Sequence, residues 1–242
     1  KKLGVIEVKF AIVTGVSKGL GEAIASLLLE AKVNVLGVSR TINDNLVQLS
    51  KKHGVMYKHF ACDLGNTSEI EKTMEEMNLT IFAHEPRTLY IVNNAAVLDP
   101  IDQAKNINGH DLAYHVHVNT VAPMMLINYY LNKASEKDMR LIGVTVTSGA
   151  ADRPVFGWSA YCSTKASVNM YTETVALEQK EHNTDHKVIA FNPGIMDTNM
   201  QEKIRSSSEE QFADVNRFKG YKENNELKNA MTVGSVLVDI IT

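Results

Sequence analysis

Short runs of β-branched and other apolar residues alternate along the chain with longer segments that have apolar residues at helical spacing. The apolar runs predict strands at residues 10–13, 33–38, 55–61, 88–92, 141–147 and 187–191. The other segments predict helices at residues 22–30, 43–53, 67–77, 102–105, 112–133, 159–182 and from about 232 to the end. Nearly continuous apolar strands that alternate with helices indicate a parallel sheet buried on both faces. With right-handed crossovers, the prediction is a single-domain α/β fold: a Rossmann-type, doubly wound parallel sheet with helices on both faces, spanning residues 1–242.

The alternation stops after residue 191, where Pro193 and Gly194 break the last strand and a mostly polar segment follows. Long connections inside a compact domain are often functional. We therefore expect residues 195–229 to form a substrate lid, with an ordinary surface insertion as the alternative.

Composition and charge narrow the classes of protein. The chain has 242 residues, 44% of them apolar, and its 25 Lys+Arg and 28 Asp+Glu give a net charge of −3, so no basic excess points to nucleic acid. The longest apolar runs, such as 121–127, are far shorter than the roughly 20 residues of a membrane helix. Glu7 and Lys9 interrupt the apolar N-terminal stretch, so we expect no signal peptide. Two distant cysteines, Cys62 and Cys162, fit a reducing compartment, and a cytoplasmic location is expected.

A glycine-rich loop at residues 14–21 directly follows the first predicted strand and opens the first predicted helix. Gly15, Gly19 and Gly21 allow a sharp turn and a close approach of the backbone to a pyrophosphate. The unpaired N–H groups at the start of the helix favour an anion at the same place. The loop therefore predicts a dinucleotide site.

The residues after the second predicted strand indicate which dinucleotide binds. An acidic residue there would bind a ribose 2′-hydroxyl, whereas an arginine accommodates a 2′-phosphate. This chain has Ser39 and Arg40 at that place, and Lys18 adds a second positive charge in the loop. The prediction is NADPH/NADP+ as cofactor, with two solvated surface cations as the alternative.

Tyr161 and Lys165 are four residues apart near the start of the longest predicted helix, so they lie on one helix face. A cation beside a phenol lowers a pKa that is ordinarily about 10, which suits Tyr161 to proton transfer. Ser148 follows the fifth predicted strand, at the sheet edge where doubly wound folds bind ligands. Its hydroxyl can donate a hydrogen bond to a substrate carbonyl, although Tyr-x3-Lys alone also describes an ordinary solvated helix face.

Together these motifs resemble the short-chain dehydrogenase/reductase family over nearly the whole chain. The resemblance implies a catalytic set of Asn119, Ser148, Tyr161 and Lys165. With the loop and Arg40, the expected cofactor contacts are Gly15, Ser17, Lys18, Gly19, Leu20, Gly21, Arg40, Asp63, Leu64, Asn94, Ala95, Ala96, Tyr161, Lys165, Pro193, Gly194, Ile195, Met196 and Thr198. Ala96 stands where the family usually has glycine, and its methyl group is expected to crowd the nicotinamide side without excluding it.

The resemblance also implies a role for each catalytic residue. Tyr161 donates the proton, and Ser148 with Tyr161 stabilises the charge that develops on the carbonyl oxygen. Lys165 holds the nicotinamide ribose and keeps the pKa of Tyr161 low. Asn119 fixes a water that returns the proton from bulk solvent.

Residues 147–151, 156–162, 196–200 and 204–208 resemble the bacterial benzil reductases, which are relatives of sepiapterin reductase. This narrower resemblance implies NADPH-dependent reduction of a ketone or an aromatic diketone. Phe156 and Trp158 are then expected to line the substrate pocket with Ser148 and Tyr161, with core packing as the alternative for Phe156.

Other functions remain open at this point. The chain could be a non-catalytic NADP(H)-binding sensor that interacts with a protein partner. An enzyme acting on sugars or nucleotide sugars would usually be longer at its C-terminal end. No metal is predicted, because His110, His115 and His117 precede a helix expected to face solvent and have no acidic or cysteine partner at ligand spacing.

The resemblance bears on assembly as well. Family members form homodimers or homotetramers by pairing the helices that hold Asn119 and Tyr161, and the same is expected here. The family usually adds one more strand at the sheet edge after the last helix of this chain, so the construction of that edge stays open.

Overall fold

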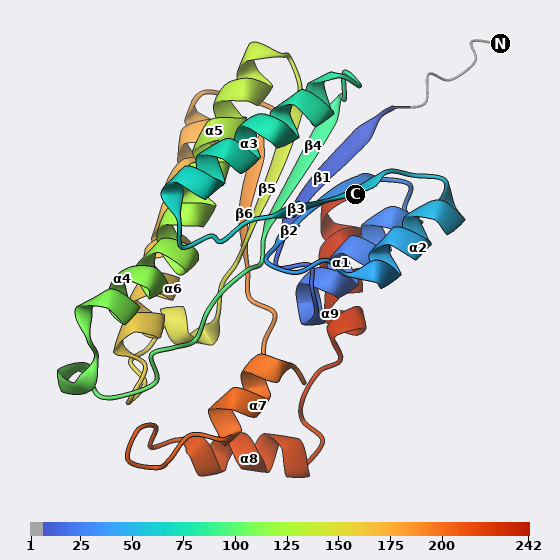
Figure 1. Ribbon diagram of the computed structural model, residues 1–242. Coiled ribbons are helices and arrows are strands. Elements are labelled where there is room, and N and C mark those ends of the chain that lie inside the picture. Colours follow the sequence, from blue (N-terminus) through green and yellow to red (C-terminus); the bar gives the residue numbers. More distant parts are fainter. Residues whose placement is uncertain (1–6) are drawn as a thin grey trace.

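A parallel six-stranded sheet in the order β3-β2-β1-β4-β5-β6 forms the centre of the computed structural model, which describes residues 7–242 (Figure 1). Its strands are β1 (Lys9–Thr14), β2 (Asn34–Ser39), β3 (Tyr57–Ala61), β4 (Thr88–Asn93), β5 (Arg140–Val146) and β6 (Lys187–Phe191). The strand order reverses between β1 and β4, and doubly wound sheets bind ligands at the carboxyl side of such a point. The predicted Rossmann-type α/β fold is confirmed. Residues 1–6 of the N-terminal stretch considered as a leader lie outside the described range.

Helices cover both faces of the sheet because successive residues of each buried strand point to opposite sides. In β1, Phe10 and Ile12 pack on one side and Ala11 and Val13 on the other. The first side is covered by α3 (Thr67–Phe82), α5 (Ala122–Glu136) and α6 (Ser159–Glu181), and the second by α1 (Gly19–Glu30), α2 (Asp44–His53) and α9 (Ala230–Ile241) (Figure 1). None of the helices described in residues 7–242 is long and apolar enough to cross a membrane.

The helix predicted at residues 112–133 is interrupted, so its predicted continuity is wrong. A π-helical turn at His117–Val121 separates α4 (Gly109–Val116) from α5. Pro123 has no N–H group to donate to the preceding turn, and the Asn119 side chain is hydrogen-bonded to the backbone of Val97 instead of facing solvent. Such π turns occur frequently at functional sites.

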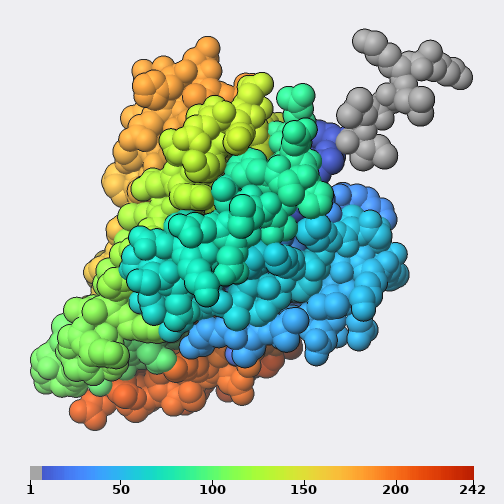
Figure 2. All heavy atoms as spheres, turned by 45° about the horizontal axis from the view of Figure 1, so that its top comes forward, coloured from blue at the N-terminus to red at the C-terminus, as the bar shows by residue number. Residues whose placement is uncertain are grey.

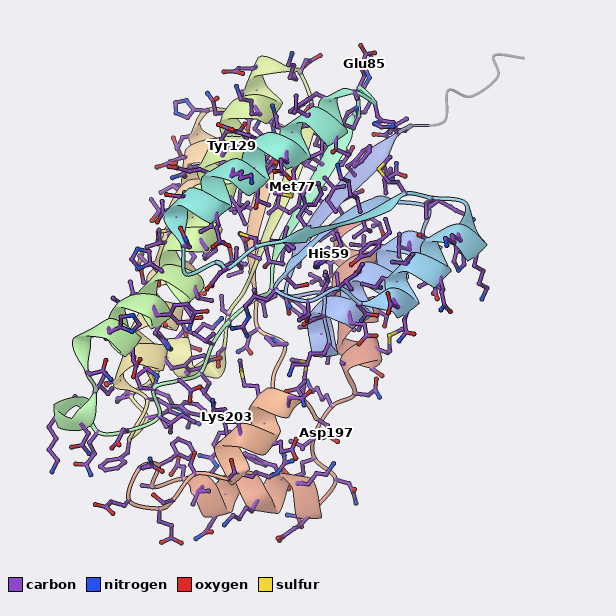
Figure 3. All side chains as sticks on the ribbon, viewed as in Figure 1. His59, Met77, Glu85, Tyr129, Asp197 and Lys203 are labelled. Carbon is purple, nitrogen blue, oxygen red and sulfur yellow. The ribbon has the colours of Figure 1, made fainter. Side chains whose placement is uncertain are left out.

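The polar segment after β6 contains two helices, α7 (Asn199–Arg205) and α8 (Val215–Glu223), which lie beyond the carboxyl edge of the sheet (Figure 1). The two ends of the segment are paired with each other, because Met196 and Lys228 form an isolated parallel bridge. On the surface the segment lies against the loop that follows β4, where Lys203 forms an ion pair with Asp99 (Figures 2 and 3). This placement puts α7 and α8 next to the ligand side of the sheet.

The loop between β4 and α4 is less regular than predicted. The helix expected at residues 102–105 is a single 3-10 turn at Ala104–Asn106. Asp102 accepts hydrogen bonds from the backbone of Gln103 and the side chain of Asn106, and a side chain that satisfies nearby donors in this way competes with a regular helix.

Candidate active site

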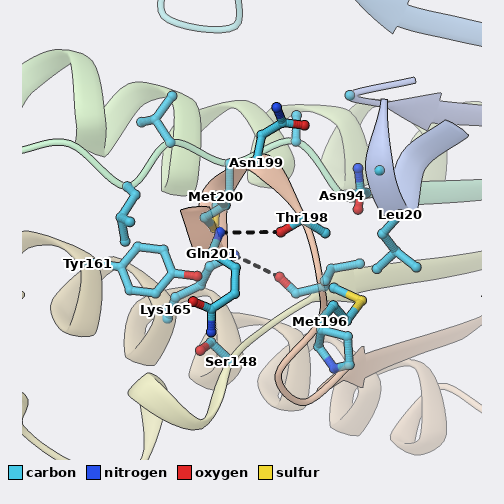
Figure 4. A pocket seen from close by; sticks show the side chains of 18 of the residues that line it. Leu20, Asn94, Ser148, Tyr161, Lys165, Met196, Thr198, Asn199, Met200 and Gln201 are labelled. Carbon is cyan, nitrogen blue, oxygen red and sulfur yellow. Dashed lines mark hydrogen bonds between the residues drawn. The ribbon is translucent and has the colours of Figure 1, made fainter. Parts of the chain in front are cut away.

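A cavity of about 820 Å³ opens at the carboxyl edge of the sheet and extends from the glycine loop to the α7–α8 segment (Figure 4). Most of the predicted site residues line it: Gly15, Ser17, Lys18, Gly19, Leu20, Arg40, Asp63, Leu64, Asn94, Ala95, Ala96, Ser148, Trp158, Tyr161, Lys165, Pro193, Gly194, Ile195, Met196 and Thr198. Residues more than a hundred positions apart in the sequence therefore meet in one cavity. Three predicted residues, Gly21, Asn119 and Phe156, do not line it.

The glycine loop has the backbone shape that the sequence predicts. Gly15 and Gly19 have positive φ angles of +75° and +64°, which side chains other than glycine rarely adopt. Gly21 lies behind the loop, where an added Cβ would be 2.2 Å from the Gly15 carbonyl oxygen. Within the described chain the Lys18 side chain makes no capping hydrogen bond to α1, so the first N–H groups of this helix remain free for an anion.

Thr14 joins the glycine loop to the end of β4. Its hydroxyl oxygen accepts hydrogen bonds from the backbone N–H groups of Asn94 and Ala95, each at 3.0 Å. The Asn94 side chain donates in return to the Thr14 carbonyl oxygen at 3.0 Å. These bonds fix two cavity walls relative to each other.

The end of the cavity near β2 and β3 carries both signs of charge. Arg40 and Lys18 are exposed, and neither forms an ion pair with a carboxylate among residues 7–242. Asp63 accepts a hydrogen bond from the Tyr114 hydroxyl at 3.0 Å and one from the Gly65 backbone at 2.9 Å. The Tyr114 ring lies directly on Gly65, where an added Cβ would be 2.2 Å from the ring. The sequence did not point to Tyr114, because on an amphipathic helix it looks like any other partly buried position.

Tyr161 and Lys165 are both buried on the first turns of α6, beside Ser148 at the end of β5 (Figure 4). The Lys165 Nζ atom is 5.7 Å from the centre of the Tyr161 ring and donates to the Val146 carbonyl oxygen at 2.9 Å. The cation and the phenol therefore share one helix face inside the cavity, as their spacing predicts.

The expectation that Lys165 keeps the pKa of Tyr161 low is wrong for this structure. Burial raises the pKa of Tyr161 to about 12, and hydrogen bonding with Ser148 offsets this only in part. Burial also lowers the pKa of Lys165 to about 8. Both shifts have the same cause, since a buried site disfavours the charged form of either group. At neutral pH Tyr161 is therefore protonated, and Lys165 is largely charged.

Asn119 lies behind the cavity wall rather than in it. Its side-chain oxygen accepts from the Val97 N–H at 2.8 Å, and its Nδ2 donates to the Val97 carbonyl oxygen at 2.8 Å and to His115 Nε2 at 3.0 Å. Both ends of the Asn119 amide thus have protein partners. The two bonds to Val97 hold the backbone of that residue in place, and Val97 lines the cavity. The predicted role of Asn119 in fixing a water stays a prediction.

His115 is completely buried. Its Nδ1 donates to the Asp99 carbonyl oxygen, which leaves Nε2 as the acceptor for Asn119. Its ring is also 6.2 Å from the Tyr161 ring, centre to centre. Three histidines close together in the sequence suggested one shared environment, but α4 turns only His115 toward α6. Within residues 7–242, no three or more His, Cys, Asp or Glu side chains are grouped so that they could hold a metal ion.

Phe156 was expected to contact substrate, but its side chain is 52% exposed and points out of the cavity. The turn at Gly157 causes this, because Gly157 has φ +80° and an added Cβ there would be 2.0 Å from the Gln211 carbonyl oxygen. The turn carries Trp158 back into the protein, where its ring is stacked on Phe212 at 4.7 Å and lies 5.3 Å from Tyr161. Of the predicted aromatic pair, only Trp158 lines the cavity.

The α7–α8 segment supplies cavity residues that the sequence did not single out. They include Gln201, Arg217, Phe218 and Tyr221. Their segment is polar and has no regular pattern of apolar residues, so the sequence does not show which of its residues line the cavity.

Comparison with known proteins agrees with this geometry. Residues 9–209 match the short chain dehydrogenase family. Benzil reductase ((S)-benzoin forming) of Bacillus cereus is 34% identical over 233 residues, which are 96% of this chain and 94% of the relative. The protein of the same name from Bacillus subtilis (strain 168) is 34% identical over 230 residues, which are 95% and 92% of the two chains. The crystal structure of the KRED1-Pglu enzyme has a TM-score of 0.80 and 28% identity, and covers 96% of this chain and 94% of its own. On the family match and on this similarity along almost the whole chain, the protein belongs to the short-chain dehydrogenase/reductase family of oxidoreductases.

Proposed function

We propose that this protein is an NADPH-dependent carbonyl reductase whose substrates are ketones and, above all, aromatic diketones such as benzil. One observation carries the proposal: the protonated phenol of Tyr161, with Ser148 and Lys165 beside it, shares a single cavity with the glycine loop. A proton donor and a dinucleotide cradle in one cavity are what carbonyl reduction requires. The names of the two Bacillus relatives support benzil as the first substrate to test.

The residues present fit a dinucleotide. The loop around Gly15 and the start of α1 offer backbone N–H groups to the pyrophosphate, and the absence of a side chain at Gly21 lets the loop pack closely behind them. Lys165 would hold the nicotinamide ribose. Arg40 and Lys18, both exposed and without a carboxylate partner among the described residues, would bind a 2′-phosphate. When bound, the reduced cofactor supplies a hydride to the carbonyl carbon.

The residues of the chain supply the proton and stabilise the charge. As the carbon–hydrogen bond forms, the electron pair of the C=O π bond moves to the oxygen. Ser148 and Tyr161 donate hydrogen bonds to this oxygen, and the Tyr161 hydroxyl then transfers its proton to give the alcohol. A phenol with a pKa of about 12 holds this proton throughout the neutral range. The Lys165 ammonium stabilises the phenolate that remains until it regains a proton.

The substrate end of the cavity fits an aromatic carbonyl compound. Trp158, Phe218 and Tyr221 line it, and each is in edge or stacked contact with another aromatic ring. These rings offer flat apolar surface beside the proton donor, while α7 and α8 would close over the substrate as a lid. The wall of aromatic groups favours an aryl ketone over a sugar.

The test is a steady-state assay of benzil reduction with NADPH and NADH compared side by side, on the wild type and on Arg40→Leu. We expect NADPH to be preferred, and Arg40→Leu to lose about 10-fold to 100-fold in kcat/KM for NADPH, because one charge-assisted hydrogen bond to a phosphate is removed. The value for NADH should stay unchanged. Lys72→Leu, on the exposed face of α3, is the matched control and should alter neither.

Three outcomes would contradict the proposal. Absence of NADPH oxidation with benzil would remove the reductase assignment. A preference for NADH would remove the cofactor assignment. Equal losses for both cofactors in Arg40→Leu would remove the role of Arg40.

We also propose that two copies of the chain associate through the side of the molecule that contains α5 and α6. Met170 and Leu177 on α6 are 64% and 56% exposed, which leaves apolar surface on the expected pairing helix. A monomer by sedimentation at micromolar concentration would contradict this assembly.

A further inference from the structure

Two hydrogen-bond donors in the lining of the cavity are buried without a protein partner. Among the described residues that line it, these are the Nε2 amide of Gln201 and the indole Nε1 of Trp158. Buried donors in proteins are nearly always paired, because leaving one unpaired is unfavourable. A donor that no protein group satisfies, on the wall of a ligand cavity, therefore points to a ligand atom as its partner.

Gln201 is well placed to meet a substrate. It lies on the first turn of α7 and is only 3% exposed. Its side chain extends from α7 toward Ser148, on the same side of the cavity as Tyr161 and Lys165 (Figure 4). The donor thus lies next to the groups that would hold a reacting carbonyl oxygen.

Arg205 determines which end of the Gln201 amide faces the cavity. The Arg205 guanidinium donates to the Gln201 side-chain oxygen at 3.3 Å. Because a guanidinium can only donate, the atom that it contacts must be the amide oxygen. The NH₂ group of Gln201 is then the end left for a ligand, and its orientation does not rest on an arbitrary choice of amide rotamer.

We infer that Gln201 is a specificity-determining residue that donates a hydrogen bond to the second carbonyl oxygen of a vicinal dicarbonyl substrate. The inference rests on the proposed carbonyl reduction and adds the residue that recognises the second carbonyl group of the proposed diketone substrate. In a vicinal dicarbonyl the second oxygen is on the carbon next to the one reduced. With the first oxygen held by Ser148 and Tyr161, a neutral donor beside Ser148 is the group that can reach the second.

This arrangement separates dicarbonyls from simple ketones. A monoketone of the same shape has a CH₂ group where the dicarbonyl has its second C=O, so it would leave the Gln201 amide buried and unpaired. Sites built to hydrogen-bond a substrate group discriminate strongly against an analogue that lacks it. Gln201 is therefore expected to favour the dicarbonyl without taking part in proton transfer.

The experiment compares benzil with deoxybenzoin, which has the same two phenyl rings but one carbonyl, using saturating NADPH. The variants are Gln201→Met, which keeps the length and removes the donor, and Gln201→Glu, which keeps the shape and, as a carboxylate beside Arg205, has no donor. We expect each to lower kcat/KM for benzil about 10-fold to 100-fold more than for deoxybenzoin. Trp158→Phe, which removes the other unpaired donor and keeps an aromatic ring, should leave the ratio of the two substrates unchanged.

The outcomes separate this inference from the proposed function. If wild-type protein reduces neither substrate, the proposed function fails, and the inference fails with it. If the wild type reduces both and the Gln201 variants lose activity equally on both, the function stands and the role of Gln201 is overturned. A selective loss for benzil in Trp158→Phe instead would assign the second oxygen to the indole. NADPH affinity and the thermal midpoint of each variant show that it is folded, and Gln201→Glu decides the question if Gln201→Met does not fold.

Discussion

Replacement of Gly21 by alanine adds a single methyl group at the tightest point of the glycine loop. The added Cβ would be 2.2 Å from the Gly15 carbonyl oxygen and 2.5 Å from Asn94 Nδ2. Ordinary contacts of a carbon atom with these atoms are more than an ångström longer than the first of these distances, so the backbone at Gly15 has to move. Overpacking of this kind typically costs about 1–3 kcal/mol of the free energy of unfolding.

The same displacement would disturb the cofactor cradle. Because Gly15 donates its N–H to the Val38 carbonyl oxygen at 2.7 Å, a shift of the loop also weakens its attachment to β2. We expect Gly21→Ala to bind NADPH at least about 10-fold more weakly. The added methyl group strains the loop, and the displaced loop no longer fits the pyrophosphate. Titration of NADPH fluorescence measures the dissociation constant, and urea unfolding measures the stability.

Gly220→Ala is the matched control. Gly220 is in the middle of α8, and an added Cβ there would have no atom within 4 Å among the described residues. Alanine in a helix interior is favourable by roughly 0.5–1 kcal/mol relative to glycine, so this variant should be as stable as the wild type or slightly more stable. Wild-type NADPH affinity together with wild-type stability in Gly21→Ala would refute the close approach and the cradle that depends on it.

Three further predictions concern buried titratable groups. His115→Phe removes the hydrogen bonds to the Asp99 carbonyl and to Asn119, so it should lower the free energy of unfolding by about 2–4 kcal/mol in a urea titration; a change near zero would contradict the buried network. Burial lowers the pKa of His115, so on acidification the unfolded chain binds a proton at this histidine more readily than the folded chain does. The stability that this group contributes is therefore lost below about pH 6.5. Between about pH 7.5 and about pH 5.5, the loss of stability should be smaller in His115→Phe than in the wild type. Because burial lowers the pKa of Lys165 to about 8 and raises that of Tyr161 to about 12, kcat/KM for carbonyl reduction should be level near neutral pH and fall above about pH 8, and a profile level to pH 10 or beyond would contradict the role of Lys165.

The parallel sheet could be predicted because the buried strands are apolar almost throughout and alternate with helices. β1 shows why this pattern is reliable: both of its faces are covered, so both have to be apolar. The glycine loop and the Tyr161–Lys165 pair were also predictable, because each depends on spacing within one short segment. Backbone turns and helix faces are local properties that a sequence displays directly.

The remaining features depend on contacts between distant segments. His115 is buried because Asn119 and Thr164 are near it, and Thr164 is on α6, far along the chain. The interruption of the helix at Asn119 follows from a hydrogen bond to Val97, and no periodicity of apolar residues reveals such a bond. A pattern of apolar and polar positions gives the faces of a helix but not the groups it will meet.

The cavity shows the same limit. Phe156 and Trp158 were both expected in the substrate pocket, yet the turn at Gly157 places only Trp158 inside. The pKa of Tyr161 was expected to fall because of Lys165, whereas burial of the phenol raises it. Both outcomes depend on how deeply a side chain is enclosed, which is a property of the assembled fold.

The Tyr161 hydroxyl is the group on which the account depends most directly. Tyr161→Phe removes only this hydroxyl and keeps the ring that packs against Trp158 at 5.3 Å. Single-turnover and steady-state assays with benzil and NADPH should show kcat reduced by at least about 100-fold, because a positioned proton donor contributes on that scale. NADPH binding should remain close to that of the wild type. Turnover within a few-fold of the wild-type rate would contradict the assignment of Tyr161 as the proton donor.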